Sequence, residues 1–125
     1  MRSKFLPAAL AIAIILMAPS IPAKNAQAPR GQELFLRRCS GCHAPDVNKE
    51  GPRLRGVYRR KAAGVQDFGY SDALRKLKVR WDEKSLDRWL SDPYAMAPDT
   101  DMAFRLMDRE ERKAVIAYLK SLSPR

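Results

Sequence analysis

The segment Cys39-Ser40-Gly41-Cys42-His43 is the most informative stretch of this sequence. The chain has 125 residues, and its two cysteines and its single histidine all lie within these five positions. Cysteine sulfur and imidazole nitrogen are side-chain ligands that soft and borderline metals prefer. We therefore expect one site, built here, to organise the whole fold.

The N-terminal residues have the three-part pattern of a secretory signal peptide. A basic start at residues 1–4 precedes an apolar run at residues 5–18, which only Pro7 interrupts. That run is shorter than the roughly 20 residues that a membrane-spanning helix needs. Small residues and prolines follow, and they predict cleavage after Ala23 or Ala28. We expect a periplasmic protein whose signal peptide is residues 1–28, with retention at the membrane through an uncleaved signal as the alternative.

Residues 29–125 are expected to form one small domain. Helical patterns cover residues 29–42, 71–78, 81–90 and 108–122, whereas most glycines lie in residues 44–70 and prolines interrupt residues 91–107. No strand alternation is evident. Small exported domains usually need a disulfide, a metal or a cofactor, and two cysteines this close together make a poor long-range disulfide. The pattern predicts an all-α fold of about four helices, with long loops wrapped around a bound group and no sheet.

Three interpretations of the cysteine–histidine segment compete. A thioredoxin-like redox pair needs a βαβ unit, which the sequence lacks. A structural zinc site needs four ligands, which usually come from two separated pairs, and there is no second pair. Covalent haem attachment needs C-x-x-C-H alone: two thiols reach the vinyl groups at one haem edge, and the histidine binds the iron. We therefore predict one haem c, attached through Cys39 and Cys42, with His43 as an iron ligand.

The second axial ligand of that iron is expected to be a methionine, because no second histidine exists. Met102 lies in an extended loop far from His43 in sequence, so the loop can cover the opposite haem face. Met96 is the alternative. Met107 directly precedes Asp108, the expected start of the last helix, and is read as a packing residue. We predict His43 and Met102 as the two metal ligands.

Taken together, these motifs resemble a class I cytochrome c of the mitochondrial and bacterial short-chain type. The resemblance extends from about Gly31 to Leu122. The matching motifs are Gly31-x-x-x-Phe35, the Cys39–His43 segment, Gly51-Pro52-x-Leu54-x-Gly56, Arg60-Lys61, residues 68–74, Trp81 with Trp89, residues 98–104 and residues 114–120. This family folds around a single haem and carries electrons.

The resemblance implies a role for several further residues. The Pro52 carbonyl should accept the Nδ1 proton of His43, and Arg60, Tyr70 and Trp81 should bind or neutralise the haem propionates. The resemblance also implies a crossing of the first and last helices, in which Gly31 and Phe35 meet Val115 and Tyr118. Leu54, Leu86, Leu90 and Phe104 should pack on the haem.

Two departures from the family pattern stand out. Trp89 occupies a position where relatives usually carry a tyrosine near the methionine sulfur. Three acidic residues, Asp92, Asp99 and Asp101, border the methionine loop, where the mitochondrial type is rich in lysine. The formal net charge is nevertheless +10, because basic residues gather elsewhere, mainly in residues 53–80. A standard face for docking acidic partners is therefore not expected around the methionine loop.

These observations predict a monomeric single-electron carrier, not an enzyme. Its partners would be redox proteins: a donor dehydrogenase or cytochrome complex, and an acceptor oxidase. Neither a nucleic acid nor a small-molecule substrate is expected. The main alternative is a dedicated haem c subunit of a periplasmic dehydrogenase. An open-iron enzyme or gas sensor would require that Met102 does not bind iron, and a basic nucleic-acid binder would require a cytoplasmic chain without haem.

Overall fold

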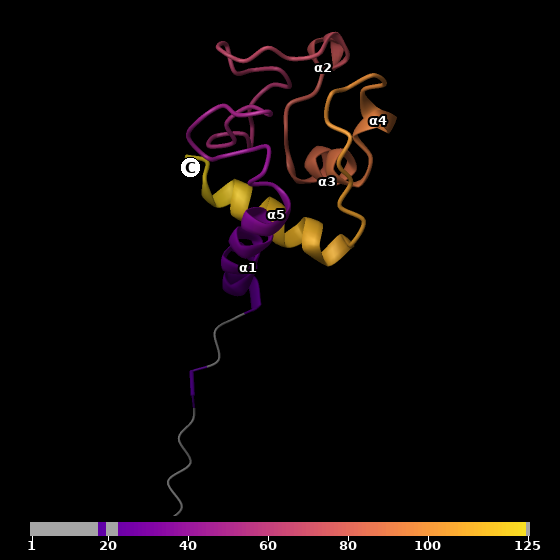
Figure 1. Ribbon diagram of the computed structural model, residues 1–125. Helices are drawn as coiled ribbons and strands as arrows, with labels where there is room; N and C mark the ends of the chain where they lie inside the picture. Colours follow the sequence, from indigo (N-terminus) through magenta and orange to yellow (C-terminus); the bar gives the residue numbers. More distant parts are fainter. Residues whose placement is uncertain (1–17, 20–22, 125) are drawn as a thin grey trace, which may run out of the picture.

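The computed structural model describes residues 18, 19 and 23–124. Five helices occur in this part of the chain: α1 (Ala23–Arg38), α2 (Asp72–Lys76), α3 (Glu83–Ser91), α4 (Pro93–Met96) and α5 (Arg109–Ser121) (Figure 1). The described residues contain no strand, only an isolated antiparallel bridge between Lys61 and Arg80. The expected all-α fold with long loops is thus confirmed, with one helix more than predicted.

The additional helix, α4, is a single turn inside the segment predicted to be loop. Pro93 was expected only to end the preceding helix. In the structure it is also the first residue of α4, and the Asp92 side chain accepts a hydrogen bond from the Ala95 amide at 3.2 Å. Aspartate at the N-cap followed by proline at the first helical position favours helix initiation.

Side chains of the N-cap residues start the other helices after α1. Ser71 caps α2, Asp82 forms a reciprocal capping box with Ser85 at the start of α3, and the Asp108 carboxylate accepts from the Glu111 amide at 2.7 Å to start α5. Each cap satisfies an amide that a helix terminus otherwise leaves without a partner. The predicted starts near residues 71 and 108 are confirmed.

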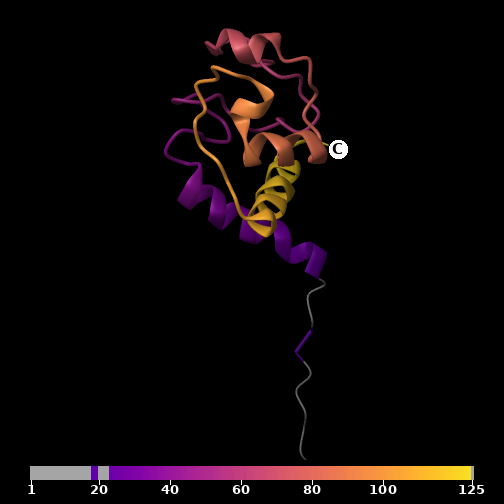
Figure 2. The ribbon, with the colours of Figure 1, turned by 90° about the vertical axis from the view of Figure 1, so that its right-hand side faces the viewer.

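The first and last helices cross in close contact (Figures 1 and 2). Gly31 lies against the backbone of Ala114, and a Cβ there would also come within 2.9 Å of the Tyr118 Cβ. The rings of Phe35 and Tyr118 have centroids 5.4 Å apart. The predicted crossing is present, with Ala114 rather than Val115 opposite the glycine. This contact anchors the end of α1, from which the cysteine segment begins.

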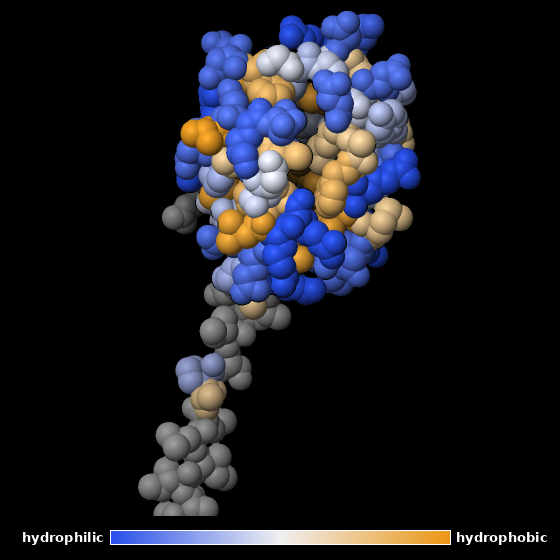
Figure 3. Space-filling view, in the orientation of Figure 1, coloured by the Kyte–Doolittle hydropathy of each residue, from blue (hydrophilic) through white to orange (hydrophobic). Residues whose placement is uncertain are grey.

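The loops form the upper part of the molecule in Figure 1, above the crossing of α1 and α5. Several apolar side chains there pack against the buried core and yet stay half-exposed, among them Cys39, Leu54, Leu74 and Met102. Apolar atoms gather along a hollow at the centre of this face (Figure 3). Phe104, expected to pack on the haem, is 37% exposed. None of the described helices is long and apolar enough to cross a membrane.

Candidate functional site

The two cysteines lie on a tight turn that continues directly from α1. The Cys39 amide donates to the Phe35 carbonyl at 2.8 Å, and the amides of Cys42 and His43 donate to the Cys39 carbonyl at 3.1 and 2.8 Å. Both cysteines are free thiols. The turn therefore presents two thiols and an imidazole from one short, hydrogen-bonded segment.

The His43 ring is held from behind by the loop that follows it. Its Nδ1 atom lies 2.8 Å from the Pro52 carbonyl, so Nδ1 carries the proton and donates it. Nε2 is thereby left with the lone pair that a metal binds. Burial lowers the pKa of His43, and the Lys49 charge lowers it further, while the bond to Pro52 opposes the shift. The environment therefore favours the neutral imidazole, which is the form that ligates iron.

Gly51 makes room for the His43 ring, although from the sequence this glycine was named only as part of a motif shared with the family. A Cβ at residue 51 would overlap Cε1 of His43 and lie 2.7 Å from both ring nitrogens. The Gly51 amide also donates to the Cys42 carbonyl at 2.8 Å, which holds the loop against the turn. Glycine thus allows the backbone to approach the face of the imidazole.

The thiols do not suit a zinc site. Burial raises the pKa of Cys39 to about 11, outweighing the opposing effect of Arg38. A bound metal would lower that pKa, so the number of ligands decides against zinc, and not the protonation of the thiol. Among the described residues, no group of three or more cysteine, histidine or acidic side chains could hold a metal ion. Protein side chains alone therefore do not build a closed metal site here.

Met102 is positioned by a tryptophan. The indole N–H of Trp89 donates to the Met102 sulfur at 3.2 Å. Trp89 is itself buried, and its ring centroid lies 5.3 Å from that of Trp81. Met107, by contrast, is 74% exposed. Trp89 was predicted to differ from the tyrosine of relatives. In the structure its indole N–H, carried on a rigid ring, holds the Met102 sulfur.

Arg60 and Trp81, both predicted to face haem propionates, are brought together by backbone pairing. The Trp81 amide donates to the Arg60 carbonyl at 2.9 Å. The half-buried Arg60 guanidinium donates to the carbonyls of Arg53 and Arg55 at 2.9 and 3.1 Å, and it has no carboxylate partner among the described residues. Burial lowers its pKa. A half-buried cation without a counter-ion suits an anionic group of a cofactor.

Tyr70, the third residue predicted to face the propionates, lies in a different loop from Arg60 and Trp81. Its hydroxyl accepts a hydrogen bond from the Val65 amide at 3.1 Å and keeps its own proton to donate.

Thr100 was not identified as a site residue from the sequence. It is the only buried polar side chain in the described part of the chain, 4% exposed, and its Oγ1 accepts only a weak 3.5 Å contact from the Met102 amide. The signal was available, because Thr100 lies two residues before the predicted ligand.

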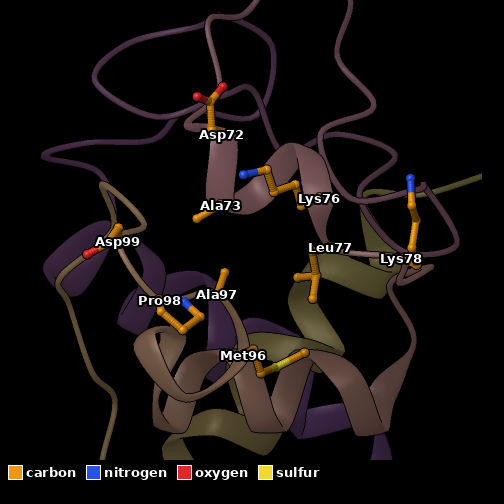
Figure 4. A pocket seen from close by; sticks show the side chains of 9 residues that line it. All are labelled: Asp72, Ala73, Lys76, Leu77, Lys78, Met96, Ala97, Pro98 and Asp99. Atoms are coloured by element: carbon orange, nitrogen blue, oxygen red, sulfur yellow. The ribbon is translucent and has the colours of Figure 1, made fainter.

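A groove of about 530 Å³ separates α2 from the turn that follows α4. Figure 4 shows Leu77 opposite Met96 and Ala97 in this groove, with charged side chains around them. None of the predicted site residues lines it. We therefore place the candidate site at the cysteine turn, His43 and Met102, where the reactive donors are, and not in this groove.

Comparison with known proteins agrees with this geometry. The cytochrome c family model matches residues 28–123. The chain belongs to the cytochrome c family. It is 38% identical to cytochrome c of Euglena viridis over 98 residues, which are 76% of this chain and 96% of that protein. Cytochrome c2 iso-2 of Magnetospirillum molischianum is 41% identical over 100 residues, 78% of this chain and 99% of the relative.

A solved structure supports the fold. Cytochrome cH from Methylobacterium extorquens superposes with a TM-score of 0.71 at 38% identity, covering 75% of this chain and 97% of that one. As a member of the cytochrome c family, the protein carries one covalent haem c through Cys39 and Cys42, and it transfers electrons rather than catalysing a reaction. The predicted family, fold and cofactor are confirmed.

The described residues fit this cofactor. Two free thiols share one turn, an imidazole presents Nε2, and a thioether on a separate segment is fixed by an indole N–H. Apolar side chains beside them remain half-exposed, as expected of surfaces that pack on a porphyrin. The cation at Arg60 and the buried hydroxyl of Thr100 can receive carboxylates.

Proposed function

We propose that His43 and Met102 are the two axial ligands of the haem iron, and that the protein shuttles single electrons between periplasmic redox proteins. The observation that supports this most is that both ligand side chains are oriented by hydrogen bonds: Pro52 holds the His43 ring through Nδ1, and Trp89 donates to the Met102 sulfur. Donors fixed in this way need little rearrangement when the iron changes charge, which favours rapid electron transfer.

The haem supplies a one-electron iron couple, and the protein side chains set its environment. Pro52 keeps the His43 ring in one tautomer and one orientation. Buried Trp89, whose ring packs on Trp81, lies against the Met102 sulfur. Arg60, Tyr70, Trp81 and Thr100 are proposed to receive the propionates. No substrate bond is made or broken.

Replacing Trp89 with phenylalanine is expected to lower the reduction potential. The indole N–H withdraws electron density from the Met102 sulfur, which weakens its donation to ferric iron and so favours the ferrous form. The hydrogen bond contributes about 1 kcal/mol, which is about 43 mV for one electron, and only part of that depends on redox state, so we expect a fall of about 10–40 mV. Voltammetry of the holoprotein measures it. An unchanged reduction potential in Trp89→Phe would mean that the Trp89–Met102 hydrogen bond does not influence the iron.

Replacing Met102 with alanine tests the proposed ligand directly. The oxidised wild-type protein is expected to show a methionine-to-iron charge-transfer band, and Met102→Ala should lose that band completely. Met96→Ala is the matched control, because Met96 is half-buried beside the groove and is not held by Trp89. Loss of the band in Met96→Ala, with retention in Met102→Ala, would transfer the ligand role to Met96.

We propose that residues 1–28 direct export and are removed, which leaves residues 29–125 as the haem domain. Pro29 lies inside α1. Proline is costly within a helix and favourable at its first position. Cleavage after Ala28 would therefore suit the helix better than cleavage after Ala23. Intact mass of protein purified from the periplasm distinguishes the two sites, and an uncut chain in the membrane fraction would contradict export of a free carrier.

A dedicated haem subunit of a periplasmic dehydrogenase is the second candidate. It is favoured by the surface next to the methionine loop, where Tyr94 is 44% exposed and Asp99 and Asp101 are also exposed. An exposed aromatic side chain suits a fixed protein interface, and the exposed acids can pair with cations of the partner at its rim. Gel filtration of the native protein distinguishes the roles: a free carrier elutes as a monomer, and a subunit elutes with a larger partner.

A further inference from the structure

Two loop segments of the molecule pair to form a short two-sided ribbon. Residues 59–62 and 78–81 lie side by side (Figure 2). The Arg59 amide donates to the Trp81 carbonyl at 2.6 Å, the Trp81 amide to the Arg60 carbonyl at 2.9 Å, and the Ala62 amide to the Val79 carbonyl at 2.8 Å. One side of this ribbon carries Arg60 and Trp81 towards the interior.

The other side of the ribbon is entirely basic. Arg59, Lys61, Lys78 and Arg80 are all exposed. We call these four residues the basic ribbon. Lys61 and Arg80 are directly opposite each other, and the flanking hydrogen bonds make them the closer type of antiparallel pair. Like charges in that position destabilise the pairing.

The basic ribbon also carries backbone strain. Arg59 has a φ of 72°, in the left-handed region, where glycine would fit without penalty. Its carbonyl accepts a hydrogen bond from the Arg80 guanidinium at 2.5 Å, which keeps both residues in place. The fold thus tolerates both strain and charge repulsion to hold these cations together, and neither feature helps stability.

Neighbouring acids do not neutralise the basic ribbon. None of its four side chains forms an ion pair with a described residue, whereas Arg53 and Arg55 pair with Asp67 and Asp46. The adjacent Asp82 carboxylate is ionised, but it caps α3 and forms no ion pair with the ribbon. Lys76, at the end of α2, adds a further exposed cation beside the groove (Figure 4). The field of the basic ribbon is therefore directed to solvent.

We infer that the basic ribbon docks the acidic surface of a redox protein partner. The inference rests on the proposed electron-carrier role. The large exposed apolar residues Leu36, Val47, Tyr94, Phe104 and Met107 all lie outside the ribbon, so this face offers charge without an apolar side chain to insert into lipid. Charge complementarity of this kind speeds encounter and gives brief complexes. The inner face of the ribbon, with Arg60 and Trp81, would lie directly behind the docked partner.

Stopped-flow reduction of the ferric holoprotein by an acidic flavodoxin in its reduced form tests the inference. One electron passes from the flavin to the haem. At low ionic strength, Lys61→Gln/Arg80→Gln should slow this reaction about fivefold, and the difference should vanish in high salt. Lys84→Gln/Arg88→Gln is the matched control, because it removes the same charge from exposed positions on α3, and it should change the rate less than about twofold.

Equal slowing in both variants, or no slowing in either, would overturn the inference. So would a flavodoxin rate that stays unchanged while Lys61→Gln/Arg80→Gln abolishes sedimentation with phosphatidylglycerol vesicles, because that result would assign the ribbon to a membrane surface. A visible spectrum of each variant, and its rate of reduction by a small uncharged reductant, report on the haem separately. A defect confined to Lys61→Gln/Arg80→Gln would assign the slower flavodoxin reaction to loss of the Arg80–Arg59 hydrogen bond and overturn the docking inference, whereas a defect shared by both variants and the wild type would fault the proposed ligation.

Discussion

Substituting alanine for Gly31 is expected to lower the free energy of unfolding by about 2 kcal/mol or more. The added Cβ would overlap the carbonyl oxygen and carbon of Ala114 and lie 2.9 Å from the Tyr118 Cβ. Because backbone atoms of α5 cannot rotate away, the two helices must separate. Separation would also disturb the packing of Phe35 on Tyr118.

The direction of this change in stability distinguishes the helix crossing from helix propensity. Alanine is favoured over glycine inside a helix by about 1 kcal/mol, so Gly31→Ala would stabilise α1 if nothing opposed it. Gly69→Ala is the control, because an added Cβ there meets nothing within 4 Å. Guanidinium denaturation of the holoproteins measures both. A Gly31→Ala protein as stable as the wild type would mean that α1 and α5 do not cross as described.

Substituting alanine for Gly51 is expected to damage the site itself. The new Cβ would occupy the space of the His43 ring, so the imidazole must turn and release the Pro52 carbonyl. Overpacking and loss of this hydrogen bond together should cost about 3 kcal/mol. We also expect weaker axial ligation, visible as high-spin character in the absorption spectrum, because the ring no longer presents Nε2 in a fixed direction.

Gly41→Ala is the matched control for this substitution. Gly41 lies between the two cysteines, yet a Cβ there meets nothing within 4 Å. The Gly41→Ala protein should therefore keep the wild-type spectrum and stability. If Gly51→Ala behaved like Gly41→Ala, the contact between the loop and the imidazole would not determine how His43 is held.

Local chemistry explains why much of this site was predictable. Both thiols and the imidazole lie within five residues, so their role could be predicted without knowing the fold. The start of α5 could be predicted from its capping aspartate. Met102 could be preferred over Met96 only by loop context. Its contact with Trp89 joins residues from separate elements, and the sequence indicated only that the hydrogen bonding there would differ.

Features that depend on contacts between distant segments were not predictable. The pairing of Lys61 with Arg80 joins two loops that show no strand alternation, so the basic residues were seen only as a charge excess in residues 53–80. The single turn α4 was missed because Pro93 was read as the end of one helix and not also as the beginning of another. The importance of Gly51 is visible only when the ring that it faces is in place.

Carbon monoxide binding to the reduced holoprotein tests the central claim most directly. Carbon monoxide binds ferrous haem only where an axial position is open or its ligand leaves easily. If His43 and Met102 hold both positions in a carrier, the visible spectrum of the reduced protein should not change when the gas is added. Prompt formation of a carbon monoxide complex in the wild-type protein would contradict the account, because it would mean an open iron suited to ligand chemistry.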